Sequence, residues 1–328
     1  MHKIVVDIYG ADAGPEVIIR GVAAGLKQGI CFFPVLVGDA ELIRKTMDEA
    51  QISQDRYEIL DTDKYITNND PPTCVFGGMD DSSMVMAYSR LKQDDGCHAL
   101  LSAGNTGALL VGSIFRLGLQ PGLKFPALAS ALPAANGKLV CLVDCGANVE
   151  CSAADLVRFA RMGNVFSRAY CGIENPRVGL MNVGREAQKG TALTKEAYEK
   201  LQTLPLNFIG NLEGSDLLTG YADVVVTDGF SGNLLLKNAE AVGKAALAIV
   251  EQVAADADPG LLAKIRESLT KAFDFNAQGA ATFLGTKKTV VKMHGCADEN
   301  TVVTSVLQIL RLEKAGFAQA MQEEMAAR

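Results

Sequence analysis

Short, nearly uninterrupted apolar runs alternate with helical patterns along the chain, and this alternation constrains the fold more than any other feature. Apolar runs without polar interruptions are typical of parallel strands that are covered on both faces. Strands connected through helices make right-handed crossovers, which build a doubly wound sheet. The sequence therefore predicts an α/β protein, a doubly wound α/β/α sandwich. The expected strands are Lys3–Asp7, Phe33–Val37, Ala99–Ser102, Leu139–Asp144, Val178–Asn182, Phe208–Gly210, Asp223–Thr227 and Thr289–Met293. The expected helices are one that begins at Pro15, followed by 105–118, 153–169, 194–202, 232–254 and 299–324.

The length predicts a large core. The chain has 328 residues, of which 48% are hydrophobic and 21% charged, so it can bury a core as one unit or as two closely joined lobes. We expect a single α/β unit over 1–328 and leave the two-lobed alternative open. The best candidate break is Asp256–Gly260.

An amphipathic helix is expected within 256–276, as an excursion from the main unit. Its apolar positions lie on one face, and basic residues lie elsewhere on the same helix. Such a helix can rest on a membrane surface or a partner, or it can pack on its own protein. The apolar positions are Leu261, Leu262, Ile265, Leu269 and Phe273.

Charge and cysteine usage exclude several classes of function. A formal net charge of −7 argues against a nucleic-acid partner, because such proteins need a cationic surface. The eight cysteines form no Cys-x-x-Cys pair and only three histidines accompany them, so we expect reduced thiols, no metal site and no cofactor. No apolar run approaches the roughly 18 residues that span a bilayer, and the apolar run after Met1 is too short for a signal peptide, so we expect a cytoplasmic protein.

Glycine-containing polar turns follow several of the expected strands. In an open parallel sheet, ligands bind beyond the carboxyl ends of the strands. A glycine turn followed by a helix N-terminus presents free N–H groups and a positive dipole end, which suit a phosphate group. Any one of these turns can be purely structural, since tight turns need glycine. Together they predict a phosphorylated or phosphate ligand. The turns are Asp7–Asp12, Ser102–Gly107, Asp144–Asn148, Asn182–Gly190, Thr227–Asn233 and His294–Gly295.

Three common catalytic signatures are absent from the sequence. There is no Gly-x-x-x-x-Gly-Lys-Ser/Thr loop, no Gly-x-Gly-x-x-Gly at the first strand–helix turn and no Gly-x-Ser-x-Gly elbow. Nucleotide hydrolysis of the P-loop kind, dinucleotide binding and serine-hydrolase chemistry are therefore disfavoured. Lys189, in the polar loop after an expected strand, is the most suggestive cation, and His294 is the better placed of the histidines.

Six motifs in order along the chain resemble the PlsX family of phosphate acyltransferases. Asp80–Met84 and His294-Gly295 extend the resemblance, which covers nearly the whole chain. The motifs are Ser102–Ala108, Asp144-x-Gly146-Ala147-Asn148, Asn175–Leu180, Leu193–Tyr198, Asn207–Asn211 and Asp228-Gly229-Phe230-x-Gly232-Asn233.

This resemblance implies a fold like that of isocitrate and isopropylmalate dehydrogenases, in a homodimer. It implies transfer of a fatty acyl group from acyl carrier protein to inorganic phosphate, with acyl phosphate as the product for phospholipid synthesis. Contact of 261–273 with the membrane surface is a further implied property. The best catalytic matches are Lys189 and Asn233.

The implied chemistry suits these residue types. Phosphate dianion is already a nucleophile, so the protein needs to position it and to stabilise the oxyanion formed on attack. We expect Lys189 to supply positive charge to the phosphate or to the oxyanion, and Asn233 to donate an amide N–H to the thioester oxygen. We expect Asn105, Thr106 and Gly107 to bind the phosphate. The remaining candidates for phosphate or substrate binding are Asp12, Ser83, Asn148, Gly190, Asp228 and His294.

Four segments depart from the family pattern. Ala11 replaces the second glycine of the family's opening Gly-Gly-Asp, and Phe125 stands where the family commonly has arginine. Gly77–Asp81 replaces the basic run that usually precedes Ser-Ser-Met, and Arg185–Gln188 replaces the acidic stretch before Lys-Gly. These changes bear on the acyl donor and on phosphate affinity. The alternatives are a short-chain acyl-CoA:phosphate acyltransferase, a dehydrogenase on the same fold and a non-catalytic interaction protein.

Overall fold

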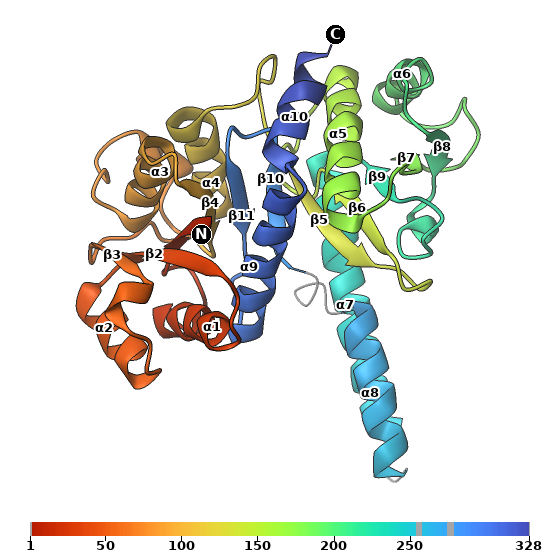
Figure 1. The fold of residues 1–328 in the computed structure, drawn as a ribbon. Helices are drawn as coiled ribbons and strands as arrows, with labels where there is room; N and C mark the ends of the chain where they lie inside the picture. Colours follow the sequence, from red (N-terminus) through yellow and green to blue (C-terminus); the bar gives the residue numbers. More distant parts are fainter. Residues whose placement is uncertain (1, 254–257, 274–278, 328) are drawn as a thin grey trace. The chain divides into compact units, whose positions relative to one another are not determined.

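The chain forms two compact units, and one of them is built from two separate stretches of sequence. The computed structural model describes residues 2–253, 258–273 and 279–327. Unit 1 comprises Met1–Pro126 and Gly279–Arg328, and unit 2 comprises Ala127–Gln278 (Figure 1). The expected break at Asp256–Gly260 lies partly outside the described residues.

Unit 1 contains a mostly parallel sheet in the order β3-β2-β1-β4-β11-β10. Every neighbouring pair is parallel except β10 with β11. The strands are β1 (His2–Asp7), β2 (Phe32–Gly38), β3 (Glu58–Asp61), β4 (Cys97–Ser102), β10 (Ala281–Leu284) and β11 (Thr289–Lys292). The helices are α1 (Pro15–Lys27), α2 (Ala40–Glu49), α3 (Ser83–Gln93), α4 (Thr106–Gly112), α9 (Glu299–Lys314) and α10 (Phe317–Ala326).

Both faces of this sheet are buried. Ile4 of β1 and Leu101 of β4 join one hydrophobic core with residues of α1 and α9. Their neighbours Val5 and Leu100 are equally buried and point to the other face, because side chains alternate along a strand. This two-sided burial explains why the strands appear in the sequence as continuous apolar runs.

The strands of unit 2 pair in the order β5-β6-β9-β7-β8. β5 is antiparallel to β6, and the remaining neighbours are parallel. The strands are β5 (Ala127–Pro133), β6 (Leu139–Val143), β7 (Val178–Met181), β8 (Phe208–Leu212) and β9 (Val224–Val226), and the helices are α5 (Ala153–Phe166), α6 (Ala192–Leu201), α7 (Gly229–Val253) and α8 (Pro259–Phe273).

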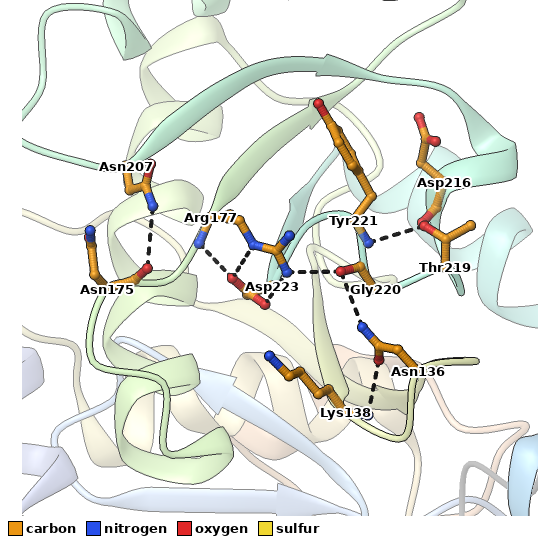
Figure 2. Close-up of polar contacts among 10 residues, drawn as sticks. All are labelled: Asn136, Lys138, Asn175, Arg177, Asn207, Asp216, Thr219, Gly220, Tyr221 and Asp223. Carbon is orange, nitrogen blue, oxygen red and sulfur yellow. Dashed lines mark hydrogen bonds and ion pairs between the residues drawn. The ribbon is translucent and has the colours of Figure 1, made fainter.

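An ion pair joins the beginnings of two strands of unit 2, β7 and β9. The guanidinium of Arg177 donates from Nε to Oδ2 of Asp223 at 2.9 Å and from Nη2 to Oδ1 at 2.8 Å. Nη2 also donates to the carbonyl of Gly220 at 2.8 Å, an oxygen that accepts from Asn136 as well (Figure 2). The Asp223 side chain is only 7% exposed, so this pair fixes the strand ends opposite the expected ligand edge.

Helix α8 lies within the segment 256–276 and runs alongside α7 (Figure 1). Phe273 of α8 packs directly against Gly243 of α7, where a Cβ atom would lie only 2.3 Å from the Phe273 Cβ. Arg266 of α8 pairs with Glu251 of α7 at 2.8 Å. Leu262, Ile265 and Leu269 are half-buried and Leu261 is 54% exposed, so only part of the apolar face is covered within unit 2. Among the described helices, none combines the length and the apolar character needed to cross a bilayer.

Several strands and helices were not predicted from the sequence. β3, β5, β10, α2 and α3 were not among the expected strands and helices, and β5 and β10 are antiparallel to their neighbours β6 and β11, where parallel strands were expected. β5 has the sequence Ala-Leu-Ala-Ser-Ala-Leu-Pro, which contains no β-branched residue. The helix expected over 299–324 is two helices, because Gly316 adopts a left-handed conformation with φ of 65°.

Candidate active site

Asp144 holds together the loop that follows β6 in unit 2. Its side chain is fully buried. Oδ1 accepts backbone N–H groups of Leu128, Gly146 and Ala147 at 3.0–3.1 Å, and Oδ2 accepts the backbone N–H and the amide of Asn148, both at 2.7 Å. Burial raises the pKa of Asp144, although these hydrogen bonds oppose the rise. The loop is therefore a rigid support whose shape depends on one carboxylate.

The first turn of α7 packs directly on this loop. Asp228 caps the helix, because its Oδ1 accepts from the backbone N–H of Ser231 at 2.7 Å and its Oδ2 accepts the Ser231 hydroxyl at 2.9 Å. The N–H of Gly229 donates to the carbonyl of Asn148 at 2.8 Å. A side chain at Gly232 would overlap the carbonyl of Asp144, so only glycine permits this approach. Asn148 and Asp228, both expected at the site, are thus brought together.

Asn233 lies in this same first turn of α7. The residue is exposed and lies beside Gly146, since a Cβ placed on that glycine would stand 3.6 Å from Asn233 Oδ1. Within the described part of the chain, the Asn233 side chain makes no hydrogen bond. A fixed helix turn with an unengaged amide is a suitable donor for a developing oxyanion.

Lys189 follows β7, the strand next to β9 in the sheet. Its Nζ lies 3.0 Å from Glu186 Oε1, and the side chain is 49% exposed. Asn182 donates its amide to the Lys189 carbonyl at 3.0 Å. Gly190 has φ of 103°, and a Cβ there would collide with Asn182 and Thr194. The loop is therefore built to turn sharply after Lys189.

The Lys189 loop and the Asn233 turn come from neighbouring parallel strands of one unit. Both follow the carboxyl ends of these strands, as the sequence predicts. In residues 127–253, no hydrogen bond or ion pair joins Lys189 to Asn233 directly. The ammonium and the amide are therefore two separate polar groups along the same edge of the unit 2 sheet.

Unit 1 carries the other glycine turns. Asn105 caps α4, with its Oδ1 accepting the Ala108 N–H at 3.0 Å, while its amide donates to the carbonyl of Thr67 at 3.3 Å. Thr106 and Gly107 form the first turn of α4, and a Cβ on Gly107 would meet Pro72 at 2.6 Å. The Asn105 side chain therefore shapes the turn and is already engaged by protein groups.

Asp12 and the His294 turn lie together in unit 1. The Asp12 N–H donates to the Gly295 carbonyl at 2.7 Å. Both Asp12 and His294 are exposed, and His294 Nδ1 lies 3.0 Å from Cys296 Sγ. Ser83, also expected to bind substrate, is fully buried, so its hydroxyl faces the protein interior beside Asp7 rather than solvent.

A buried hydrogen-bond network around Asp7 lies beneath these turns, and it was not predicted from the sequence. Asp7 ends β1 and accepts the Ser102 hydroxyl at 2.8 Å, and Ser102 in turn accepts the Gly104 N–H at 3.0 Å. Lys292 ends β11 and donates to the Ala103 carbonyl at 3.1 Å. Burial raises the pKa of Asp7, while hydrogen bonds and the charge of Lys292 oppose the rise. The available signal was the position of Asp7 and Lys292 at the carboxyl ends of strands.

The departures from the family pattern are mostly neutralised locally. Asp80 pairs with Arg116, and Asp81 pairs with Lys64. The gained cation Arg185 lies 2.6 Å from Asp216 and 5.1 Å from the centre of the Tyr221 ring. Phe125 is 52% exposed. The charges introduced at these positions therefore have protein partners.

Comparison with known proteins decides the family. The profile of the family described as "Fatty acid synthesis protein" matches residues 2–320. This chain belongs to that family, the PlsX family of phosphate acyltransferases.

Relatives of this PlsX family member cover nearly its whole length. Phosphate acyltransferase from Clostridioides difficile is 35% identical over 95% of the chain and 93% of the relative. Phosphate acyltransferase from Thermoanaerobacterium thermosaccharolyticum is 36% identical over 98% and 96%, and that from Bacillus cereus is 36% identical over 93% of each. The family predicted from the six motifs, and with it the prediction of an enzyme, is confirmed.

Solved structures support the fold. A phosphotransacetylase from Streptococcus pyogenes matches with a TM-score of 0.64 at 17% identity, covering 98% of this chain and 94% of that one. A branched-chain phosphotransacylase from Enterococcus faecalis matches with a TM-score of 0.61 at 16% identity, covering 95% and 99%. The predicted doubly wound α/β/α fold is confirmed.

Proposed function

We propose that this phosphate acyltransferase moves a fatty acyl group from acyl carrier protein to inorganic phosphate and releases acyl phosphate for phospholipid synthesis. Membership of the PlsX family over residues 2–320 supports the reaction class. The observation that carries the residue assignment is the exposed, unengaged Asn233 amide on a rigid helix turn, beside a strand whose loop bears Lys189.

The reaction requires little covalent help from the protein. An oxygen of phosphate attacks the thioester carbonyl carbon and forms the new C–O bond. The carbonyl oxygen becomes an oxyanion, to which Asn233 donates an N–H. Collapse of this intermediate breaks the C–S bond, and the departing carrier thiolate takes a proton from solvent. Lys189 attracts the phosphate and offsets its charge as it approaches the carbonyl.

The Thr106–Gly107 turn of unit 1 is proposed as a phosphate-binding element in its own right. The first N–H groups of a helix have no partner within that helix and attract anions. Asn105 is engaged by Ala108 and Thr67. The donors that we assign to phosphate are therefore the N–H groups of Thr106 and Gly107 and the Thr106 hydroxyl.

Two further properties are proposed from the family resemblance: a homodimer and contact of 261–273 with the membrane surface. A cytoplasmic location is proposed from the apolar pattern of the sequence. The exposure of Leu261 supports the membrane contact, since it leaves an apolar side chain of α8 uncovered within unit 2. Sedimentation with anionic lipid vesicles, comparing the wild type with Leu261→Gln, tests this contact.

The decisive experiment measures phosphate-dependent release of free thiol from a panel of thioesters. A kcat/KM at least tenfold higher for long-chain acyl carrier protein than for short acyl-CoA supports the proposed donor. The opposite preference identifies the short-chain acyl-CoA enzyme. Absence of phosphate-dependent release from every thioester contradicts acyl transfer and favours an interaction protein.

A further inference from the structure

Three side chains with metal-binding chemistry meet in unit 1, at the end of the sheet opposite Asp7 and Ser102. They come from distant parts of the sequence: His2 begins β1, His98 is the second residue of β4, and Glu313 lies in the last turn of α9. One ligand atom from each lies within 4.8 Å of the others. No spacing in the sequence connects these positions, which is why motif analysis passes over them.

A β-bulge turns His98 toward this cluster. In the pairing of β1 with β4, Lys3 faces Cys97 and Ile4 faces Ala99, so His98 has no partner on β1. Cys97 lies next to Arg90 and Asp94 at the end of α3, whereas Ala99 joins the core formed with α1 and α9. The extra residue therefore breaks the alternation and places the imidazole on the α9 side.

The three side chains already contact one another. The His98 Nδ1 lies 3.4 Å from Glu313 Oε2. The rings of His2 and His98 meet edge to face, with centroids 5.1 Å apart. Ligand atoms on a tetrahedral Zn²⁺ ion, with bonds of about 2.1 Å, are separated by roughly 3.4 Å. His98 and Glu313 stand at that separation, and a ligand atom of the exposed His2 lies within 4.8 Å of both.

The surroundings orient the carboxylate. The Glu313 side chain is only 16% exposed, and Oε1 lies 3.4 Å from the hydroxyl of Thr289 on β11. Burial raises the pKa of Glu313, while the nearby histidines and Lys288 oppose the rise. Lys288 itself donates to the carbonyls of Leu91 and Asp94. The Oε2 atom of Glu313 therefore faces His98, while the Thr289 hydroxyl positions Oε1.

We propose that His2, His98 and Glu313 bind one divalent metal ion of the Zn²⁺ class, with solvent as the fourth ligand. Two imidazoles and a carboxylate suit this ion. The site joins the first residues of β1 and β4 to the last turn of α9, so the bound ion acts as a structural clamp of unit 1. It takes no part in the acyl transfer proposed above.

Titration of untagged, chelator-treated full-length protein with Zn²⁺, followed by calorimetry, tests the proposal. The wild type should bind one ion per chain, and bound Co²⁺ should give the strong visible absorption of a four-coordinate site. His98→Ala and Glu313→Gln should each weaken binding at least tenfold. His2→Ala changes an exposed residue at the first position of β1. It therefore keeps the test valid if the His98 or Glu313 variant fails to fold.

The matched control is His294→Ala combined with Cys296→Ala, which removes the third histidine of the chain and the thiol beside it. This double variant should keep the affinity of the wild type. Three results would overturn the proposal: no binding by the wild type, unchanged binding after His2→Ala or His98→Ala, or loss of binding in the double variant. Thermal unfolding gives a second measure, because Zn²⁺ should raise the Tm of the wild type and the control only.

Discussion

Asp144 and Asn233 show how differently two polar side chains at one edge can be used. The carboxylate of Asp144 is buried and accepts from the backbone of its own loop, including the N–H and the amide of Asn148. It has no capacity left for a substrate. Asn233 is exposed, and no described residue occupies its amide. A residue that supports a loop and a candidate substrate-binding residue thus differ in where their hydrogen bonds go.

Replacement of Asn233 by alanine should lower turnover about 10²–10³-fold, the usual effect of losing one oxyanion donor. The fold should be unaffected, since the amide supports no protein contact. Steady-state thiol release measures the effect. Asn238→Ala, at another exposed asparagine of α7, is the matched control and should retain full turnover. Near-normal turnover in Asn233→Ala would remove this residue from the mechanism.

Replacement of Lys189 by alanine should raise the KM for phosphate at least tenfold without changing the Tm. Its ion pair with Glu186 is exposed, and such pairs contribute little to stability because solvent screens the charges. Lys200→Ala breaks a comparable exposed pair with Glu196 and should leave both quantities unchanged. An equal effect of both variants on KM would show that the charge at Lys189 acts only at long range.

At the scale of elements, α7 can contact the Asp144 loop because Gly232 has no side chain. Gly232→Ala should destabilise the protein by about 2 kcal/mol or more and reduce turnover, because its methyl group overlaps the Asp144 carbonyl. Chemical denaturation and thiol release measure the two effects. Gly214→Ala is the control, since a Cβ there meets only Leu235 at 3.8 Å. Similar stability of the two variants would contradict the close approach.

The pair that joins the beginnings of β7 and β9 predicts a pH dependence. Burial alone would raise the pKa of Asp223, but hydrogen bonds from Arg177 and its charge hold the pKa below the usual 3.8. The stabilisation is therefore present above about pH 4 and is lost as the pH falls through the lower folded-state pKa. Asp223→Asn should cost roughly 3 kcal/mol at pH 7, a moderate value because Arg177 is 36% exposed.

Denaturation between pH 7 and pH 3 tests this pair. The difference in unfolding free energy between the wild type and Asp223→Asn should shrink as the pH falls below 4. A difference that stays constant across this range would show that Asp223 contributes by packing rather than by its charge.

Elements were predictable where one physical signal dominated. Continuous apolar runs identified most parallel strands, because burial on both faces leaves no polar positions. β5 and β10 lacked that signal: β5 is rich in alanine, and β10 has only four residues. α2 was missed although Asp39 caps it, accepting from Glu41 and Leu42. Local capping was visible in the sequence, but the apolar pattern around it was short.

At the scale of the whole molecule, the glycine turns that follow the strands could be predicted from the sequence, but the hydrogen-bond networks beneath them could not. Asn148 and Asp228 meet at the start of α7, as expected of residues that follow neighbouring strands. Ser83 is buried rather than accessible, because its position in the first turn of α3 points it toward β1. The His2, His98 and Glu313 cluster required a bulge and a long-range packing arrangement, which no local pattern encodes.

The discontinuity of unit 1 has a consequence for synthesis. β11 pairs with β4, yet residues 289–292 follow the whole of unit 2 in the sequence. On the ribosome, the β4 edge remains uncovered while residues 127–278 emerge, and uncovered strand edges invite pairing with other chains. Unit 2 can assemble as it is translated, whereas unit 1 waits for the last stretch of polypeptide. We therefore expect unit 1 to depend on chaperones more than unit 2, because its translation begins first and ends last.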